Sequence, residues 1–432
     1  MKQTEIGLIP DDWEVNLIGN VSEIFGRIGF RGYTVEDLVD EGFGAITLSP
    51  SNIQNGKMDF SNCSYISWKK YDESPEIKIA NGDILLVKTG STYGKSAIVK
   101  NLAKKATINP QFVVIKKTKC NNELLGYLIQ TPIVQEQIEA SIVGGAIPTL
   151  SQKQIASFKI PLSKSIKEQQ RIAKALSDVD AVISTTEKLL QKKKNIKQGT
   201  MQELLTGKKR LPGFSKSNNT KMTELGEIPE DWEVKKLNRE CIIKARIGWQ
   251  GLKSEEYLDS GDYVLITGTD FNNGFINWKS CNYVSEWRFK QDKNIQIKQG
   301  DVLITKDGTI GKIAFLNKIP MQGTLNSGVF VVRPKNNQQI NPIFLSLVFK
   351  SFWFDNFLEQ ITSGSTIVHL YQKDFLKFNF PLPPKEEQNS IAKILSDMDN
   401  EIDLLNKKLE KYRNLKTAMM QQLLTGKIRL VK

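Results

Sequence analysis

The stretch EQQRIAKALSDVDAVI, residues 168–183, returns as EQNSIAKILSDMDNEI at residues 387–402. The two stretches share a Glu-Gln start, an Ile-Ala-Lys triplet and a Leu-Ser-Asp-x-Asp ending, at an offset of 219 residues (387 − 168). Apolar residues recur in both at steps of three and four, the spacing of one face of an α-helix. The chain therefore contains a duplicated helical segment, and so long a period indicates two domains rather than turns of a solenoid.

Other matching segments extend the duplication over most of the 432 residues. Each copy has the same internal order, with a globular portion first and a long helix after it. The pairs are IGLIPDDWEV (6–15) with LGEIPEDWEV (225–234), GDILLVKTGSTYGK (82–95) with GDVLITKDGTIGK (300–312), and LLTGKKRL (204–211) with LLTGKIRL (423–430).

One long helix is predicted at 167–205 and another at 386–424, because neither segment contains proline and Gly207 and Gly426 follow their ends. A helix of about 38 residues is roughly 57 Å long. With a single apolar stripe it needs a partner, and the other copy supplies one as a coiled coil. The predicted seam residues are Ile172, Leu176, Val179, Ile183, Leu190, Ile391, Leu395, Met398, Ile402, Leu405 and Leu409.

The globular portions mix short β-type runs with Gly, Asn and Pro and with helical stretches such as 123–139. This pattern predicts an α/β (α+β) fold for each. Trp13 and Trp232, in Pro-Asp-Asp-Trp and Pro-Glu-Asp-Trp turns, are interpreted as packing anchors. The expected boundaries are a globular domain at 1–165, a helix at 166–207, a linker at 208–222, a second globular domain at 223–385, a helix at 386–426 and a tail at 427–432.

The balance of charge points to an anionic partner. There are 60 Lys and Arg against 47 Asp and Glu, a formal net charge of +13, and nucleic acid is the commonest partner of so basic a chain. Well-dispersed charge is the alternative. We expect a cytoplasmic protein without a membrane segment, because no secretory signal is recognisable and the most apolar run, 343–349, is too short to span a bilayer. The four cysteines, which show no CxxC pair, are expected to be reduced thiols without zinc.

The stretch from Lys88 to Ser96, KTGSTYGKS, resembles a phosphate-binding loop but has three residues between Gly90 and Gly94 where that motif needs four. The second copy has only two there, with Ile313 where the motif needs a hydroxyl. The only histidine, His369, corresponds to Thr149, so a catalytic histidine repeated in each copy is excluded. We also find no glycine-rich nucleotide fingerprint. The chain is therefore predicted to be non-catalytic and to bind no metal.

The two copies share a strand followed by a lysine, a glycine turn and a second lysine. Such a turn can approach a phosphate backbone closely and donate hydrogen bonds to it. An ordinary hairpin with solvated lysines is the alternative interpretation.

Taken together, the IPEDWE-type start, the GDIL-K-G-GK middle, the PL-EQ-IA-LSD-D segment and the helix ending in LLTGK resemble the DNA-specificity subunits of type I restriction-modification enzymes. The resemblance covers nearly the whole chain. It implies two target-recognition domains, each reading half of a split asymmetric site in double-stranded DNA, with the helices packed antiparallel as a spacer. It also implies docking of two methyltransferase subunits that carry S-adenosylmethionine, and of motor-nuclease subunits that use ATP and Mg. No cofactor is expected on this chain.

Candidate DNA-binding residues lie in the matched lysine turns, in the RIG loops and just before the long helices, including positions where the copies differ. Gln and Lys side chains suit adenine and guanine edges respectively. The candidates are Arg27, Arg31, Lys88, Ser91, Thr92, Tyr93, Lys95, Gln152, Lys153, Arg246, Gln250, Lys306, Asp307, Thr309, Lys312, Tyr371, Gln372 and Lys373. Two other functions stay open, a coiled-coil adaptor between proteins and a stand-alone DNA-binding protein.

Overall fold

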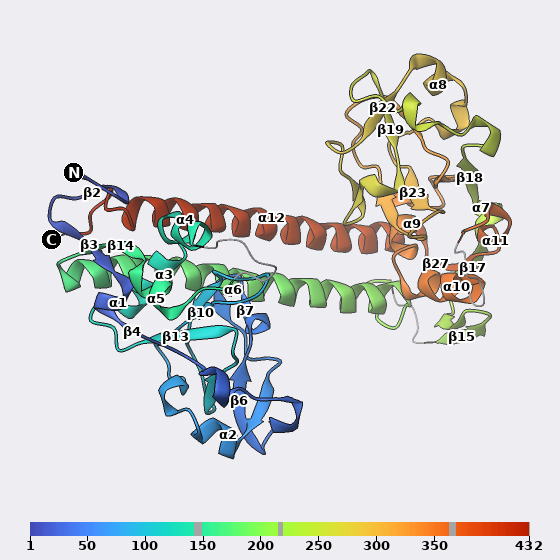
Figure 1. Ribbon diagram of the computed structural model, residues 1–432. Helices are drawn as coiled ribbons and strands as arrows, with labels where there is room; N and C mark the ends of the chain where they lie inside the picture. The colour runs from blue at the N-terminus through green and yellow to red at the C-terminus, as the bar shows by residue number, and fades with distance from the viewer. Residues whose placement is uncertain (142–148, 215–218, 363–368, 432) are drawn as a thin grey trace. The chain divides into compact units, whose positions relative to one another are not determined.

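A computed structural model describes residues 1–141, 149–214, 219–362 and 369–431. Packing divides the chain into two compact units, one made of Met1–Glu187 with Lys407–Lys432 and the other of Lys188–Asn406. The long helices α6 (Ile166–Leu205) and α12 (Lys385–Leu423) each contribute to both units (Figure 1). Each unit is thus completed by a segment of the other repeat.

The two long helices predicted at 167–205 and 386–424 are confirmed to within one residue at each end, whereas the wider bounds 166–207 and 386–426 extend two and three residues past the observed ends. Gly207 and Gly426 follow them with positive φ angles of 70° and 69°, the left-handed conformation that closes a helix. By contrast, the helix predicted over 123–139 is wrong as a single element. Pro132 cannot continue a helix, so α3 (Asn122–Ile129) ends before it and α4 (Pro132–Ala140) begins with it.

The main sheet of the first unit is antiparallel at its centre. Strand β10 carries Ile84, Leu85, Leu86 and Val87, all fully buried, as expected of a strand covered on both faces. Among the described residues the sheet has the order β4 (Glu23–Gly26), β13 (Phe112–Lys116), β10 (Ile84–Val87), β11 (Ser96–Ile98), β8 (Lys57–Met58) and β7 (Ile53–Gln54).

Smaller elements complete the first unit. A second sheet packs beside the main one, and a two-stranded ribbon leads into α6. The second sheet has the order β12 (Ala106–Ile108), β6 (Gly44–Leu48), β9 (Ser64–Ser67) and β5 (Leu38–Val39); the ribbon pairs β3 (Trp13–Leu17) with β14 (Lys159–Ser163), and the hairpin of β1 (Lys2–Thr4) and β2 (Gly7–Ile9) precedes it. The short helices are α1 (Ile18–Val21), α2 (Trp68–Asp72) and α5 (Gln152–Ser157).

The second unit repeats this plan. Its main sheet has the order β18 (Cys241–Ala245), β26 (Val329–Pro334), β23 (Val302–Thr305) and β24 (Ile313–Phe315), matching β4, β13, β10 and β11. Its second sheet has the order β22 (Asn282–Val284), β19 (Tyr263–Ile266) and β25 (Gly323–Leu325). Ribbons pair β17 (Glu233–Lys236) with β27 (Asn379–Leu382), β15 (Thr220–Thr223) with β16 (Gly226–Pro229), and β20 (Phe271–Asn272) with β21 (Phe275–Ile276). The helices are α7 (Leu237–Glu240), α8 (Glu286–Lys290), α9 (Pro342–Val348), α10 (Phe352–Thr362) and α11 (Gln372–Phe375).

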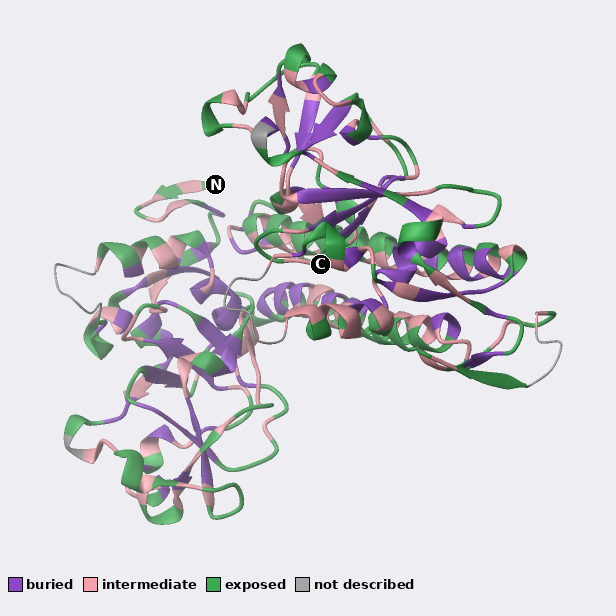
Figure 2. Ribbon diagram, turned by 90° about the vertical axis from the view of Figure 1, so that its right-hand side faces the viewer, coloured by how far each residue is buried: buried purple, intermediate pink, exposed green. Residues whose placement is uncertain are grey.

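Each unit is held by cores that join its sheet to both long helices. In the first unit Trp13 packs in one cluster with Leu176 of α6 and Leu423 of α12. In the second unit Trp232 packs in one cluster with Leu204 of α6 and Leu395 of α12. Both tryptophans are buried, in agreement with their interpretation as packing anchors. Figure 2 shows buried residues along the strands and exposed residues on many loops.

Candidate nucleic-acid interface

The lysine-and-glycine stretch closes a hairpin between β10 and β11. Gly94 N donates to Val87 O at 2.9 Å, and Val87 N donates to Lys95 O at 2.8 Å. Strand β11 follows directly at Ser96, whereas a phosphate-binding loop opens a helix. In the second unit Gly311 N donates in the same way to Thr305 O at 2.9 Å. The stretch is therefore a turn between two strands and not a phosphate-binding loop, and Lys95 and Lys312 are exposed on the two turns.

A second segment lies alongside this hairpin in both units. Leu150 N donates to Lys88 O at 2.8 Å, and Leu370 N donates to Lys306 O at 2.9 Å. A Cβ placed on Gly26 would lie 2.9 Å from Gln152 Nε2 and 3.6 Å from Lys88 Nζ. The ends of β4 and β10 and the start of α5 therefore meet. We call this meeting point the reading edge: residues 26–31, 88–95 and 149–153 in the first unit, with 245–250, 306–312 and 369–373 in the second.

Lys88 stands at the reading edge half-buried, and burial lowers its pKa. No described carboxylate forms an ion pair with it, so a bound anion would relieve the cost of burying its charge. Lys306 is half-buried at the matching place, with its Nζ 5.5 Å from the centre of the Phe330 ring.

The arginines predicted for a basic loop are structural. Arg27 is 4% exposed and donates to Ile108 O and Thr107 Oγ1, each at 3.2 Å, while Arg246 is 2% exposed and donates to Leu325 O and Thr324 Oγ1 at 2.9 and 3.1 Å. Burial lowers the pKa of both. The prediction of DNA contact by Arg27 and Arg246 is therefore corrected, because their donors tie the first strand of the main sheet to the second sheet.

Glutamines at the start of α5 and α11 also bind the scaffold. With its amide in the orientation that satisfies both neighbours, Gln152 donates to Ile24 O at 3.3 Å and accepts from Gly26 N at 3.0 Å. Gln372 donates to Ile243 O at 3.3 Å. Gln250 is 7% exposed, and its Oε1 has no hydrogen-bond partner among the described residues. Gln250 is thus enclosed by the fold, whereas Gln152 and Gln372 bind the scaffold and are still exposed.

The remaining candidates are mostly at the surface. Arg31 is part-exposed and lies 3.7 Å from Glu76. Tyr93 is half-buried against the core of the first unit, and Thr92 is also half-buried. The exposed candidates are Ser91, Lys95, Lys153, Asp307, Thr309, Lys312, Tyr371 and Lys373.

The seam residues predicted on the long helices are all buried or half-buried. Ile172, Leu176, Ile391 and Leu395 belong to the cores of the units. Ile183, Leu190 and Leu409 are buried, and Val179, Met398, Ile402 and Leu405 are half-buried. Their burial agrees with one apolar stripe on each helix.

Matched ion pairs between α6 and α12 were missed by the sequence reasoning. Asp180 pairs with Lys416 at 2.9 Å in the first unit, and Asp399 pairs with Lys197 at 2.5 Å in the second. Each aspartate ends the repeated Leu-Ser-Asp-x-Asp motif, and each lysine lies in the last third of the opposite helix. Within each unit the helices therefore run antiparallel. The repeat of both partners at an offset of 219 residues was the available signal.

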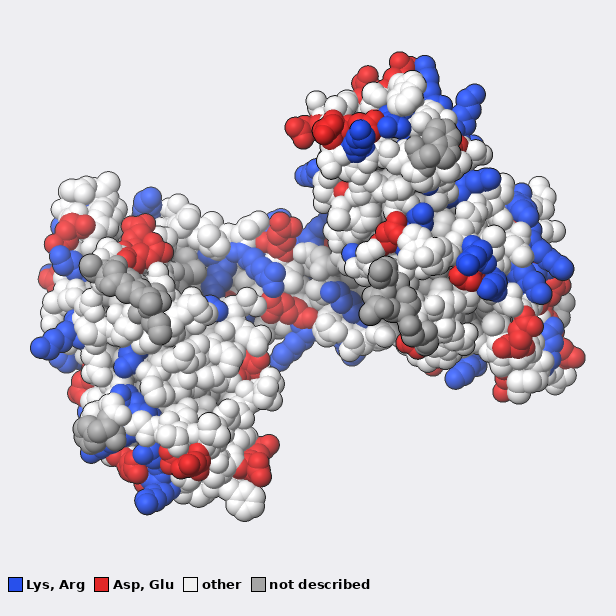
Figure 3. All heavy atoms as spheres, turned by 45° about the vertical axis from the view of Figure 1, so that its right-hand side comes forward, with Lys and Arg blue, Asp and Glu red and all other residues white. Residues whose placement is uncertain are grey.

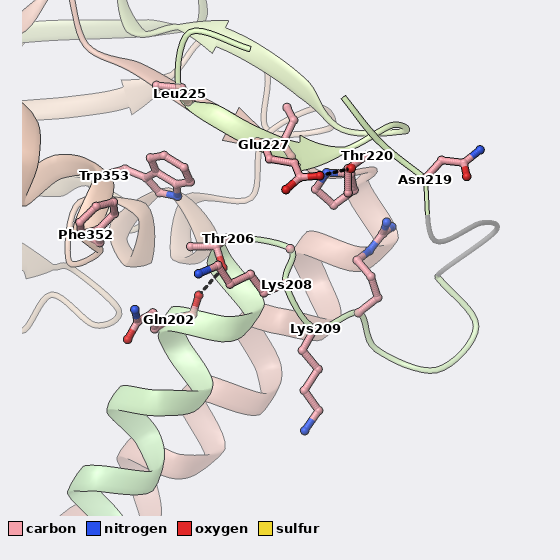
Figure 4. A pocket seen from close by; sticks show the side chains of 14 residues that line it. Gln202, Thr206, Lys208, Lys209, Asn219, Thr220, Leu225, Glu227, Phe352 and Trp353 are labelled. Carbon is pink, nitrogen blue, oxygen red and sulfur yellow. Dashed lines mark hydrogen bonds between the residues drawn. The ribbon is translucent and has the colours of Figure 1, made fainter. Parts of the chain in front are cut away.

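A pocket of about 760 Å³ lies in the second unit, beside the end of α6. Figure 4 shows Phe352 and Trp353 on one side of it and Lys209 and Asn219 on the other. The first copy has Pro132 and Ile133 in place of the two aromatic residues. The pocket offers cationic and apolar surface, and its lining includes the repeated Thr-Gly-Lys and Ile-Pro segments.

Charge on the visible face is dispersed. Figure 3 shows Lys and Arg interspersed with Asp and Glu rather than gathered into one large patch on that face. Within the described ranges no cluster of His, Cys, Asp and Glu is arranged to hold a metal ion. No helix of the described chain is both long and apolar enough to cross a membrane. The four cysteines are free.

Comparison with known proteins identifies relatives over the full length. The family model for the type I restriction modification DNA specificity domain matches residues 10–198 and 229–412. The MjaVIII and MjaIX specificity subunits of type I restriction enzymes from Methanocaldococcus jannaschii are 29% and 24% identical, over 98% and 99% of this chain and 94% and 96% of theirs. The crystal structure of the S subunit of a type I restriction-modification system from M. genitalium has the same fold, with a TM-score of 0.60, 16% identity and 98% of each chain covered.

Proposed function

We propose that this chain, which belongs to the type I restriction modification DNA specificity family, recognises the target DNA sequence for a type I restriction-modification complex. In this role it is a non-catalytic subunit. The globular portion of each repeat, 1–165 and 223–385, is a target-recognition domain that reads one half of a split, asymmetric sequence in double-stranded DNA.

One observation carries the proposal: the two reading edges share a scaffold and differ in their exposed side chains. The backbone bonds Leu150 N to Lys88 O and Leu370 N to Lys306 O are equivalent. The side chains beside them are not, since Thr89 and Ser151 stand where Asp307 and Tyr371 stand in the second copy. A fixed backbone with different donors and acceptors suits the reading of two different half-sites.

The exposed and half-buried cations of the edge are assigned to DNA. Lys88, Lys95, Lys306 and Lys312 contact phosphates, because they lie on or beside glycine turns that let a backbone come close. Lys153 and Lys373 are exposed at the starts of α5 and α11 and reach base edges or phosphates. The remaining surface candidates, Arg31, Ser91, Thr92, Asp307, Thr309 and Tyr371, contribute to base selection.

Helices α6 and α12 form an antiparallel coiled-coil spacer that sets the distance between the half-sites. The half-buried seam residues and the Asp180–Lys416 and Asp399–Lys197 pairs support this assignment. The spacer segments are 166–207, which contains α6, and 386–426, which contains α12 except its first residue. The linker 208–222 joins the first spacer segment to the second domain, and the tail 427–432 follows the second spacer segment.

Two methyltransferase subunits dock on the repeated motifs and supply S-adenosylmethionine. Motor-nuclease subunits join them and supply ATP hydrolysis with Mg. The basis for two docking sites is the close match of the LLTGK and IPEDWE motifs between repeats, because identical partners binding twice need equivalent surfaces. The complex acts in the cytoplasm, where its DNA substrate lies.

The experiment that tests this proposal is co-expression of the chain with its candidate methyltransferase, followed by sequencing of methylated adenines in the host DNA. A split motif that disappears when this chain is omitted is the expected result. If no motif forms and the chain purifies free of methyltransferase, the adaptor function is favoured instead.

A domain exchange tests the modular part separately. Replacing residues 1–165 with the corresponding portion of another specificity subunit should change one half-site and leave the other and the spacing intact. A change in both half-sites would contradict the assignment of one half-site to each domain.

A further inference from the structure

The reading edge of the second unit carries an acid–imidazole pair. Nδ1 of His369 is in direct polar contact with Oδ1 of Asp307, and the His369 and Tyr371 rings lie 4.4 Å apart between centres. The side chain of Asp307 is 45% exposed and that of His369 is 27% exposed. The imidazole is thus held from one side by the tyrosine while the carboxylate faces outward.

The first copy has different side chains at the same two backbone positions. Thr89 and Thr149 take the places of Asp307 and His369, and their backbones form an isolated β-bridge. Both partners have changed together between the repeats, whereas the flanking lysine, Lys88 or Lys306, is retained. Asp307 and His369 therefore form a pair that is specific to the second copy, on a scaffold that both copies share.

An exposed carboxylate at a DNA-facing edge needs a specific partner, because it repels phosphates. Among base edges in the major groove it also repels the N7 and O6 of guanine and the O4 of thymine, and it accepts from an amino group. Adenine presents N7 beside its amino group, while the edge of cytosine itself carries the N4 amino group and no acceptor. With one oxygen held by His369, the free oxygen of Asp307 suits cytosine N4.

We propose that Asp307 reads a cytosine in the half-site of the second domain by accepting a hydrogen bond from N4, and that His369 is the positioning residue that orients its carboxylate. This inference rests on the proposed function of the chain. The neighbouring cations Lys306, Lys312 and Lys373 hold the phosphates on either side, so that the carboxylate meets a base rather than the backbone.

The first test compares methylated motifs from co-expression of wild-type and variant chains. Asp307→Ala should relax one cytosine of one half-site to two or more bases and leave the other half-site unchanged. His369→Gln should relax the same position partially. Glu286→Gln, which alters an exposed carboxylate of α8 that pairs with Lys290, is the matched control and should leave the motif intact.

The second test uses a base analogue and the purified methyltransferase complex. Replacing the assigned cytosine with pyrimidin-2-one, which lacks the N4 amino group, should weaken binding of the wild-type complex by about 10-fold. The same replacement should have little effect on the Asp307→Ala complex, because the hydrogen bond is already absent. Thermal unfolding of the variant, compared with that of Glu286→Gln, checks that the fold is intact.

The outcomes distinguish failure of the proposed function from failure of the Asp307 assignment. A wild-type chain that directs no split motif overturns the proposed function. A split motif that Asp307→Ala leaves unchanged overturns only the assignment of Asp307, and so does a relaxed position that is not cytosine.

Discussion

The guanidinium of Arg429 donates to both carboxylate oxygens of Glu168, 261 positions earlier in the chain, at 2.6 and 2.9 Å. It also binds Asp12, and the Trp13 indole donates to the same glutamate at 3.1 Å. The second unit repeats this arrangement with Arg210 and Glu387, at 2.7 and 2.8 Å. The Thr-Gly-Lys ending of each helix therefore fastens to the Trp-containing start of the opposite repeat.

Removing either arginine should destabilise the chain. Arg429→Ala leaves the carboxylate of Glu168, 1% exposed, without its cation, and breaking such a pair costs about 2–4 kcal/mol of unfolding free energy. Urea unfolding of the full chain measures the loss, and Arg210→Ala should give a similar value. Arg413→Ala is the control, because its ion pair with Glu187 is exposed and is worth less than about 1 kcal/mol. Equal losses for all three variants would contradict the structural role of the fastening.

Glycine is required just after the two long helices but not at Gly199, which lies within α6. A Cβ at Gly207 or Gly426 would lie 2.4 Å from Pro229 Cγ or Pro10 Cγ, and both glycines have positive φ angles. Gly207→Ala and Gly426→Ala should each lower the unfolding free energy by about 1–3 kcal/mol. Gly199→Ala should raise it by roughly 0.5–1 kcal/mol, since no atom lies within 4 Å of an added Cβ there. Thermal unfolding distinguishes the two directions.

The second unit should become more stable as the pH rises above neutrality, because of Lys350. Burial lowers the pKa of Lys350 to about 8, against the opposing effect of Asp399. The unfolded chain binds this proton up to about pH 10.4, so the unfolding free energy should increase between about pH 8 and 10.4.

The first copy suggests the variant that removes this effect. Gln130 occupies the equivalent place beside Gly56, as Lys350 does beside Gly274. Lys350→Gln should therefore stabilise the chain by about 1 kcal/mol at pH 7 and lose this advantage by about pH 10. Lys377→Gln, an exposed lysine paired with Asp374, is the control for urea unfolding at both pH values. A gain that is the same at pH 7 and pH 10 would show that titration of Lys350 is not its cause.

The ion pair between Asp180 and Lys416 should fix the register of the two helices in the first unit. Both side chains are 18% exposed, and the Tyr127 hydroxyl also donates to Asp180 at 2.7 Å. A double-mutant cycle with alanine should give a coupling energy of about 1 kcal/mol. The exposed pair of Lys174 and Asp178 within α6 should give only about 0.3–0.5 kcal/mol.

Contacts between lysines and DNA phosphates should make the DNA-binding constant depend on salt concentration. Lys95→Ala or Lys312→Ala should reduce the slope of log binding constant against log salt concentration by about 0.9 each, without altering the methylated motif. Lys174→Ala, a cation of α6 outside the reading edge, should leave the slope unchanged. Binding of the methyltransferase complex to its site at several salt concentrations provides the measurement. An altered motif would instead place Lys95 or Lys312 on a base edge.

The sequence predicted part of the candidate site but not which of its residues bind the scaffold and which are exposed. The lysine turns and the segments before the helices lie side by side in the structure, which the amino-acid sequence did not predict. Arg27 and Gln152 are, however, bound to the scaffold, and no local pattern distinguishes a buried arginine from one that faces DNA. Arg27 is buried because it binds Thr107 and Ile108 of strand β12, which lie about 80 residues away in the chain.

Periodicity, glycine spacing and proline placement act within a few turns of backbone. The amino-acid sequence was therefore enough to predict the duplication, the two long helices and the absence of a phosphate-binding loop. The folded chain was needed to show that each unit is completed by the opposite repeat, through Arg429 with Glu168 and Arg210 with Glu387. It also decided which cations stay at the surface and which acid meets His369. Such pairings depend on three-dimensional packing. The two charged groups attract each other strongly only after distant segments of the chain have packed together and removed the water around them.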